Sequence, residues 1–317
     1  MKGIYQHTHP LSKLFFVALA ALGCLLVSVI IAALTAMPLF GPNVLETMMG
    51  AGVSFDESNI PLLKYLQLWQ SIGLFIIPAL LLAFVFSTSV WNYLKMNKRI
   101  SMGSTVLAGF IVLLSGPLIS YVGILNAEMD LPQWLSGLEQ WMRQSEDQAG
   151  TLTKMFVKAD SIGILLYNVF LIALIPAIGE EFLFRGVVQR IFLDWTKNKH
   201  IAIWISAILF SALHLQFYGF IPRALLGAIF GYLFVWSGSI WLPVIAHFVN
   251  NTLAVVAYYL YGVGTLKTDP EKLGADMQNA WIAALLSLIA VVSLMAYFYR
   301  IERRKVGNER SKVELGL

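Results

Sequence analysis

The sequence has very few charged side chains for its length. Only 13% of its 317 residues are Asp, Glu, Lys or Arg, and 58% are hydrophobic. Soluble domains carry roughly 25% charged and about 45–50% apolar residues. So few charges cannot cover a water-facing surface, which excludes a soluble enzyme, and the abundance of apolar groups excludes a disordered chain. The composition predicts an all-α, polytopic membrane helix bundle, because helices satisfy their own backbone hydrogen bonds in lipid.

Cysteine and the common hydrolase motifs are scarce or missing. The single cysteine, Cys24, excludes an intrachain disulfide, a cysteine-based zinc site and an iron–sulfur cluster. No Ser-x-x-Lys, Gly-x-Ser-x-Gly or His-Glu-x-x-His pattern occurs, so the usual signatures of serine hydrolases and zinc proteases are lacking. The five histidines form a short list of candidate ligands and bases: His7, His9, His200, His214 and His247.

Long apolar runs fill most of the chain. A helix needs about 20 residues to cross the hydrocarbon, and about eight segments approach that length: 14–39, 66–91, 105–125, 162–188, 201–217, 222–236, 240–261 and 281–299. The first run exceeds a signal-peptide core of about 7–15 residues, so we expect it to be retained. The chain is therefore predicted to be an integral, multi-pass membrane protein, of the plasma membrane if its source is bacterial.

Basic residues gather in connections that would share one side of the bundle. They are Lys95, Lys98, Arg99, Arg190, Lys197, Lys199, Arg300, Arg303, Arg304, Lys305, Arg310 and Lys312. Cytoplasmic loops are enriched in Lys and Arg, so we expect this side to be cytoplasmic, together with both termini. The formal net charge of +4 then reflects orientation, and no nucleic-acid partner is expected.

A connection on the opposite side has an amphipathic helical pattern. Asp130 precedes Pro132, which is typical of a helix start. Trp134 and Trp141 belong to an apolar series at helical spacing. The pattern predicts an interfacial helix at 130–145, with its tryptophans at headgroup level. We favour anchoring as its role, and a gate or a resting place for substrate is the alternative.

Ionisable residues within the predicted spans are few and occur only in the C-terminal half: Glu180, Glu181, Arg185, His214, Arg223 and His247. Such groups are costly in a bilayer and mark function by default. The first three spans are therefore predicted to serve as scaffold.

The fourth span carries two carboxylates and one guanidinium. Glu181 and Arg185 are four residues apart on one helix face, so we expect an ion pair. Glu180 points about 100° away from Glu181. Pro176 predicts a local break just before the acids, because it lacks a backbone donor. Two acids against one arginine leave a surplus charge, and Glu180 is predicted to face something else.

The fifth and seventh spans add imidazole and amide groups. His247, Asn250 and Asn251 share one helix face by their spacing, and His214 lies in the fifth span. Interhelical hydrogen bonding explains each residue taken alone. Together with two glutamates they indicate one polar site around a wet cavity, because groups at this depth need water or protein as partners. We expect that cavity to open toward the cytoplasm or laterally to lipid.

These groups suit hydrolysis of an amide bond. A carboxylate and an imidazole converging on water can remove its proton, while a second imidazole and a carboxamide can donate to a developing oxyanion. The same Glu and His side chains can instead hold a divalent metal with an open position for water. An ion- or proton-coupled transporter also uses such groups, although no inverted repeat is visible. A non-catalytic membrane scaffold is the third alternative.

Three short motifs carry a family resemblance: Glu180-Glu181-x-x-x-Arg185, Phe210-x-x-x-His214 and His247-x-x-x-Asn251. In this order, within successive apolar segments, they resemble those of the CAAX prenyl protease and bacteriocin-processing (CPBP, or Abi) family of intramembrane endopeptidases. The resemblance covers about 162–261. It implies that Glu180 is the catalytic base, acting with His214 on a water. It also implies that His247 and Asn251 bind the oxyanion, with Glu181 and Arg185 as support.

The resemblance leaves the cofactor open. Members of the family are described as metalloproteases and also as metal-free glutamate enzymes, so we expect either no metal or a divalent ion such as zinc on Glu180, His214 and His247. It implies a protein or peptide substrate, prenylated or membrane-tethered, beside the lipid bilayer. One integral membrane domain over 1–317 then divides into scaffold spans (1–130), an interfacial helix (130–145), catalytic core spans (160–262) and a last span with a basic cytoplasmic tail (280–317).

Overall fold

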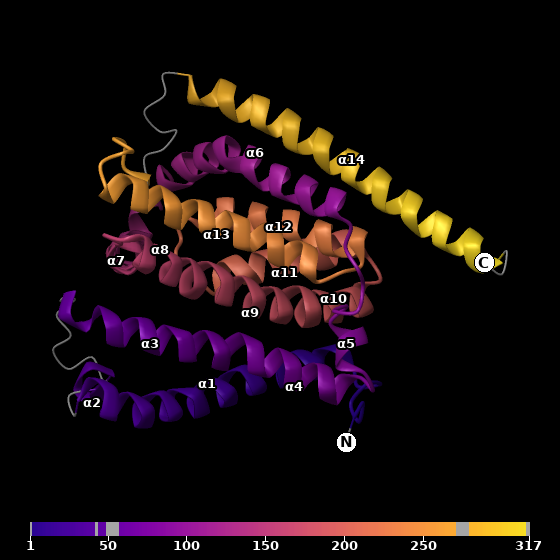
Figure 1. Cartoon of the computed structure of the whole chain (residues 1–317), viewed down its shortest axis with the longest axis horizontal. Helices are drawn as coiled ribbons and strands as arrows, with labels where there is room; N and C mark the ends of the chain where they lie inside the picture. The colour runs from indigo at the N-terminus through magenta and orange to yellow at the C-terminus, as the bar shows by residue number, and fades with distance from the viewer. Residues whose placement is uncertain (1, 42–43, 49–56, 271–278, 315–317) are drawn as a thin grey trace.

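The fold is a bundle of helices. A computed structural model describes residues 2–41, 44–48, 57–270 and 279–314, and within these ranges every regular element is helical. Seven helices in this part of the chain are long and apolar enough to cross a membrane, and Figure 1 shows most of them running alongside one another. The predicted all-α, multi-pass membrane fold is confirmed. The seven are Pro10–Phe40 (α1), Ile60–Phe86 (α3, η2 and α4), Met102–Ala127 (α6), Ile162–Thr196 (α8 to α10), Phe220–Ser237 (α12), Trp241–Gly262 (α13) and Ala280–Lys305 of α14 (Ala280–Glu314).

The eighth apolar helix, α11 (Lys199–Ala212), is shorter than the others. Its 14 residues extend about 21 Å at about 1.5 Å per residue, against a hydrocarbon thickness of about 30 Å. The helix therefore ends at Ala212, before the end of the predicted segment 201–217. A turn at 213–219 then leads into α12. α11 and α12 pack closely at Gly227, which has no side chain. A Cβ placed on Gly227 would lie only 3.2 Å from the Cβ of Ala207.

Two of the long helices contain wide, π-type turns. The second span has one such turn, η2 (Ile72–Ile76), between α3 (Ile60–Ser71) and α4 (Ile77–Phe86). The fourth span has two, η4 (Val169–Leu174) and η5 (Phe184–Val188), which flank α9 (Ile175–Leu183). The same span begins with α8 (Ile162–Asn168) and ends with α10 (Gln189–Thr196). Such turns interrupt the regular ladder and are frequent at functional sites. The break predicted from Pro176 is found as η4, since proline has no N–H for the preceding turn.

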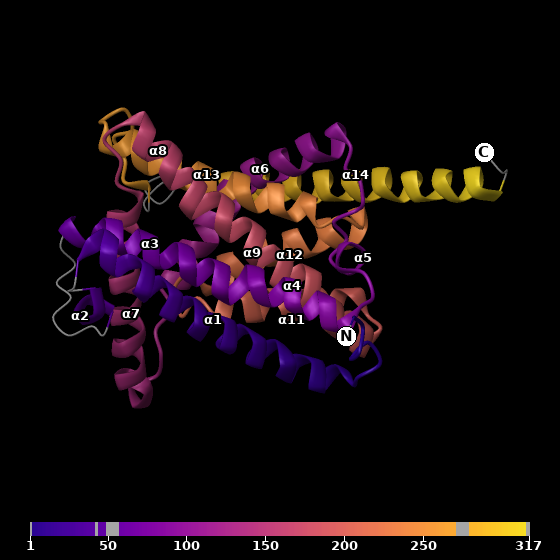
Figure 2. The ribbon, with the colours of Figure 1, turned by 60° about the horizontal axis from the view of Figure 1, so that its bottom comes forward.

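A helix that crosses the bundle follows α6. After η3 (Gln133–Leu135), α7 (Ser136–Val157) runs across the direction of α1 and α3 (Figure 2). It continues past the predicted end at 145, because apolar residues at helical spacing, Ala149, Leu152 and Phe156, continue to Val157. Trp134 is 80% exposed, as an aromatic residue at a lipid headgroup would be. Its position at the membrane interface stays a prediction. The remaining short elements are α2 (Val44–Met48), η1 (Glu57–Asn59) and α5 (Val90–Tyr93).

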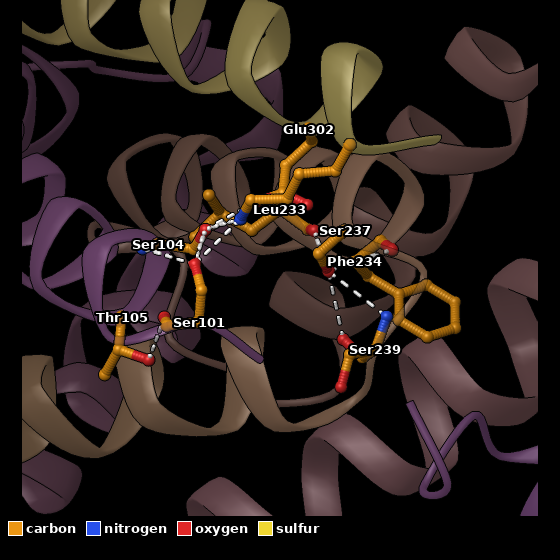
Figure 3. Close-up of polar contacts among 9 residues, drawn as sticks. Ser101, Ser104, Thr105, Leu233, Phe234, Ser237, Ser239 and Glu302 are labelled. Carbon is orange, nitrogen blue, oxygen red and sulfur yellow. Dashed lines mark hydrogen bonds and ion pairs between the residues drawn. The ribbon is translucent and has the colours of Figure 1, made fainter. Parts of the chain in front are cut away.

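The beginning of α1 and the end of α14 lie at the same end of the bundle, opposite α7 (Figure 1). A polar cluster ties α14 to α6 there (Figure 3): the hydroxyl of Ser104 donates to Glu302 Oε1 at 2.5 Å. The ammonium of Lys305 donates to the same carboxylate oxygen at 2.7 Å. This end carries the basic connections, and its cytoplasmic location stays a prediction.

Candidate active site

An ion pair is buried in the fourth span. Nη1 of Arg185 donates to Oε1 of Glu181 at 2.9 Å, and the two side chains are 1% and 0% exposed. Nη2 of Arg185 donates to the backbone oxygen of Gly227 at 2.9 Å, and the guanidinium lies 4.8 Å from the ring centre of Phe210. The ion pair expected from the four-residue spacing is thus present. Arg185 bridges one helical turn to Glu181, and through the backbone oxygen of Gly227 it also links the fourth span to α12.

His247 binds the same carboxylate. Its Nδ1 lies 2.9 Å from Oε1 of Glu181, and its ring stacks on Phe230 with the ring centres 5.1 Å apart. The oxygen of an ionised carboxylate only accepts, so Nδ1 carries the hydrogen. The other ring nitrogen, Nε2, lies 3.9 Å from Oε2 of Glu180, which is beyond direct hydrogen-bond distance. This contact between Glu181 and His247 was not predicted from the sequence.

His214 lies just beyond the end of α11. Its Nδ1 is 2.8 Å from the backbone oxygen of Phe210. A carbonyl only accepts, so Nδ1 donates, and a neutral ring keeps its lone pair on Nε2. At about 1.5 Å per residue, His214 lies about 22 Å along the chain from Lys199, and Glu180 about 24 Å from Thr196. The two residues therefore reach similar depths from the basic end.

One cavity of about 470 Å³ is lined by all four residues predicted to be catalytic: Glu180, His214, His247 and Asn251. Among the described residues, Glu180 has no hydrogen-bond partner of its own, although it is only 9% exposed. Asn250 donates from Nδ2 to Oδ1 of Asn251 at 3.3 Å. The structure thus brings the predicted set together, and the chemical roles of its members stay predictions.

The cavity extends from Glu180 and His247 toward the end of the bundle that carries α7. The fourth span runs away from the α7 end, and Pro176, which precedes Glu180 in this span, lines the cavity (Figure 1). The span α13 runs toward the α7 end, and Asn251, which follows His247, also lines the cavity. We expected a cavity that opens toward the cytoplasm or laterally to lipid, and where this cavity opens stays a prediction.

Two further polar residues line this cavity. Arg223, at the start of α12, donates from Nη2 to Oε1 of Gln216 at 2.6 Å. The Oε1 atom of Gln67 is buried without a hydrogen-bond partner in the part of the chain that the structure describes. The sequence marked Arg223 only as ionisable and assigned the second span to scaffold. The signal that could have pointed to Gln67 is a pair of glutamines, Gln67 and Gln70, at the start of an otherwise apolar span.

The turn at 213–219, which carries His214, is held by α7. Oε2 of Glu146 accepts from the backbone N–H of Tyr218 at 3.1 Å. The guanidinium of Arg143 lies 4.6 Å from the centre of the Tyr218 ring. Both contacts come from α7, so this helix braces one wall of the cavity.

Arg143 is itself fixed by acids at the start of α7. It donates to Oε1 of Glu139 at 2.7 Å and to Oδ1 of Asp130 at 2.8 Å. The hydrogen bond from Arg143, followed by that from the backbone N–H of Leu131, holds the pKa of the Glu139 carboxyl below its usual value. Glu139 consequently stays ionised well below neutral pH, and the contacts that position Arg143 persist there.

The side chains that the structure describes do not gather into a metal site. Within the described ranges, no three His, Cys, Asp or Glu side chains gather closely enough to hold a metal ion. Nδ1 of His214 is directed to a backbone oxygen and Nδ1 of His247 to a carboxylate, so Nε2 of each ring is the nitrogen left for a metal. Catalytic zinc takes three protein ligands, and among the described residues Glu180, His214 and His247 do not lie close enough together to supply such a set.

A membrane-embedded cavity with carboxylate, imidazole and carboxamide groups defines a class of intramembrane site, and comparison with known proteins narrows it. Residues 162–253 match the model of the type II CAAX prenyl endopeptidase Rce1-like family. The chain is also similar to the "uncharacterized protein YpbD" of Bacillus subtilis (strain 168), with 28% identity over 111 residues. That match covers 34% of this chain and 51% of the relative, so the chain spans about half the length of the curated relative it matches. No solved structure matches.

The segment 162–253 is thus similar to the Rce1-like family of type II CAAX prenyl endopeptidases. It contains both glutamates, both cavity histidines and Asn251. The family resemblance predicted from the three motifs is thereby confirmed. The prediction of an integral, multi-pass membrane protein is confirmed as well.

Proposed function

We propose that this protein is an intramembrane endopeptidase that cleaves a prenylated or otherwise membrane-tethered peptide. The observation that carries the proposal is the cavity on which Glu180, without a direct partner, meets two histidines and an asparagine. Similarity of 162–253 to a family of endopeptidases supports the reaction class.

In this proposal, Glu180 and His214 activate the water. The lone pair on Nε2 of His214 and the carboxylate of Glu180 can both accept from one water in the cavity. Glu180 takes a proton from this water as its oxygen attacks the carbonyl carbon of the scissile peptide. The same carboxyl then gives the proton to the departing amine, so that protons balance over the cycle.

In this proposal, His247 and Asn251 stabilise the oxyanion that forms on the scissile carbonyl. Oδ1 of Asn251 accepts from Asn250, which leaves the Nδ2 group of Asn251 to donate elsewhere. Nδ1–H of His247 is committed to Glu181, so His247 can donate to substrate only from a protonated Nε2. Because Glu181 already pairs with Arg185, the positive charge of the ring is balanced by Glu180, whose Oε2 lies 3.9 Å from Nε2. An oxyanion forming nearby is stabilised by both donors.

The direction of the cavity indicates where the substrate enters. It extends toward the α7 end, and the basic residues lie at the other. If the basic end is cytoplasmic, as the charge pattern predicts, the scissile bond is reached from the non-cytoplasmic half of the membrane.

The test is Glu180→Gln in the full chain, assayed on a membrane-tethered peptide reporter. We expect a loss of cleavage of about 10²–10⁴-fold, the usual contribution of an acid–base group, with an unchanged thermal unfolding midpoint. The matched control is Glu128→Gln, the same chemical change at an exposed residue outside the cavity, which should cleave like wild type. Full activity of the Glu180 variant would refute the proposal. Ion flux that depends on Glu180, without any cleavage, would favour a transporter instead.

A further inference from the structure

A second cavity, of about 1050 Å³, lies at the α7 end of the bundle. Phe40 at the end of α1, the first residues of α3, the end of α7, the start of α8 and the end of α13 line it. None of its lining residues also lines the catalytic cavity. Ligand cavities in proteins typically enclose about 300–1,000 Å³, so this one has room for a ligand of its own.

A buried ammonium group lines this second cavity. Lys64 is 6% exposed, and its Nζ donates to Oδ1 of Asn168 at 2.7 Å. That oxygen is uncharged, and no carboxylate of the described residues forms an ion pair with Lys64. A buried charge is costly unless a counter-charge or several hydrogen bonds satisfy it. Lys64 is therefore a cation that lacks its anion.

The other charged residues of the cavity are equal in number of each sign, so Lys64 is the surplus charge. Lys154 and Lys158 line it with Lys64, whereas Asp160 and Asp269 are its only acids among the described lining residues. Lys154 lies 3.7 Å from Asp269, so one of the two acids is already in contact with a lysine. Three ammonium groups against two carboxylates favour an anionic ligand.

The rest of the wall is apolar and aromatic. Tyr65, Tyr167, Tyr258 and Tyr261 line the cavity near the ends of their helices, where aromatic side chains lie at the depth of lipid headgroups. Ile164 lines it as well and is 38% exposed, so the apolar wall continues to the outer surface of the bundle. A buried cation beside such a wall suits a molecule with an anionic head and apolar chains.

We propose that this cavity binds the phosphate group of an anionic membrane lipid, with Lys64 as its buried cationic contact. Occupancy would also strengthen the junction between α7 and α8. Nδ2 of Asn168 donates to the backbone oxygens of Val157 and Lys158 at 3.1 and 3.3 Å, so Asn168 links Lys64 to that junction. The lipid is thus a structural ligand, independent of the proposed peptidase activity.

The experiment measures the thermal unfolding midpoint of the full-length protein in detergent with added phosphatidylglycerol, phosphatidylcholine or inorganic phosphate. A ligand that binds the folded state raises the midpoint. We expect phosphatidylglycerol to raise it by several degrees, and the other two to leave it unchanged. Lys64→Gln should abolish the rise. Its matched control, Lys197→Gln, removes an exposed lysine at the opposite end and should keep it.

Three results would overturn the proposal. They are no preference for phosphatidylglycerol over phosphatidylcholine, an undiminished rise in Lys64→Gln, and an equal rise with inorganic phosphate, which would identify a soluble anion as the ligand. If Lys64→Gln does not fold, Ile164→Trp fills the cavity from its exposed apolar side and leaves the lysine in place. That variant should fold and lose the response to phosphatidylglycerol; a wild-type response would also overturn the proposal.

Discussion

Nδ1 of His247 and Oε1 of Glu181 lie 2.9 Å apart in the centre of the bundle. The same oxygen accepts from Arg185, so one carboxylate orients an imidazole and neutralises a guanidinium. The second glutamate of the first motif thus contacts the histidine of the third motif. This relationship separates the two adjacent acids: Glu181 is enclosed among protein groups, and Glu180 is left to the cavity.

We expect Glu181→Gln to destabilise the fold, because it leaves Arg185 buried without a counter-charge. Breaking a buried ion pair by removing one partner typically costs about 3–5 kcal/mol. Replacing both residues, as Glu181→Gln with Arg185→Met, should cost less than the single change, since no charge then remains unpaired. Reversible unfolding in mixed detergent measures both. A single variant as stable as wild type would contradict the ion-pair argument.

Asn251→Ala should lower the cleavage rate by about 10²–10³-fold, the effect of removing one oxyanion donor. Asn250→Ala is the matched variant on the next residue. Asn250 lines the same cavity and donates one hydrogen bond to Asn251, and its variant is expected to lose much less activity, because Asn250 orients the proposed donor and does not itself bind the oxyanion. Steady-state kcat on the peptide reporter measures both variants. Equal losses would argue against an oxyanion role for Asn251 in particular.

Glu146→Ala should slow cleavage without disturbing the fold. Glu146 holds the backbone of Tyr218, four residues after His214, and a hydrogen bond to a charged group contributes about 1.5–3 kcal/mol. The expected loss in kcat is about tenfold, because His214 would leave its productive position part of the time. Asp147→Asn is the control, an exposed acid on the neighbouring residue. If both variants behave alike, the bracing of the turn by α7 has no effect on catalysis.

The orientation can be tested with cysteines, because Cys24 is the only one in the chain. In a Cys24→Ser background, we expect Trp134→Cys to react with a membrane-impermeant maleimide added to intact cells, and Lys197→Cys to react only after the membrane is opened. The two positions lie at opposite ends of the bundle, and both are exposed. The reverse pattern would place the basic end outside and move substrate entry to the cytoplasmic half.

The sequence predicted most of the fold because apolar length and charge scarcity decide helix formation in lipid. It also predicted the Glu181–Arg185 pair, since residues four apart share a helix face. It missed the contact between Glu181 and His247, because contacts between helices depend on tilt and rotation that no spacing rule fixes. The end of α11 at Ala212 was also not predicted, since the apolar segment continues to Phe217.

The wide turns around α9 have a consequence for how this chain tolerates changes in length. Each π-type turn holds one residue more than an α-helical turn would need. Deleting one residue within Val169–Leu174 would restore a regular helix and leave the residues on both sides on their present helix faces, so the acids keep their neighbours. The fourth span therefore contains spare length on either side of Glu180, and single-residue deletions there should be accepted more readily than inside Ile175–Leu183.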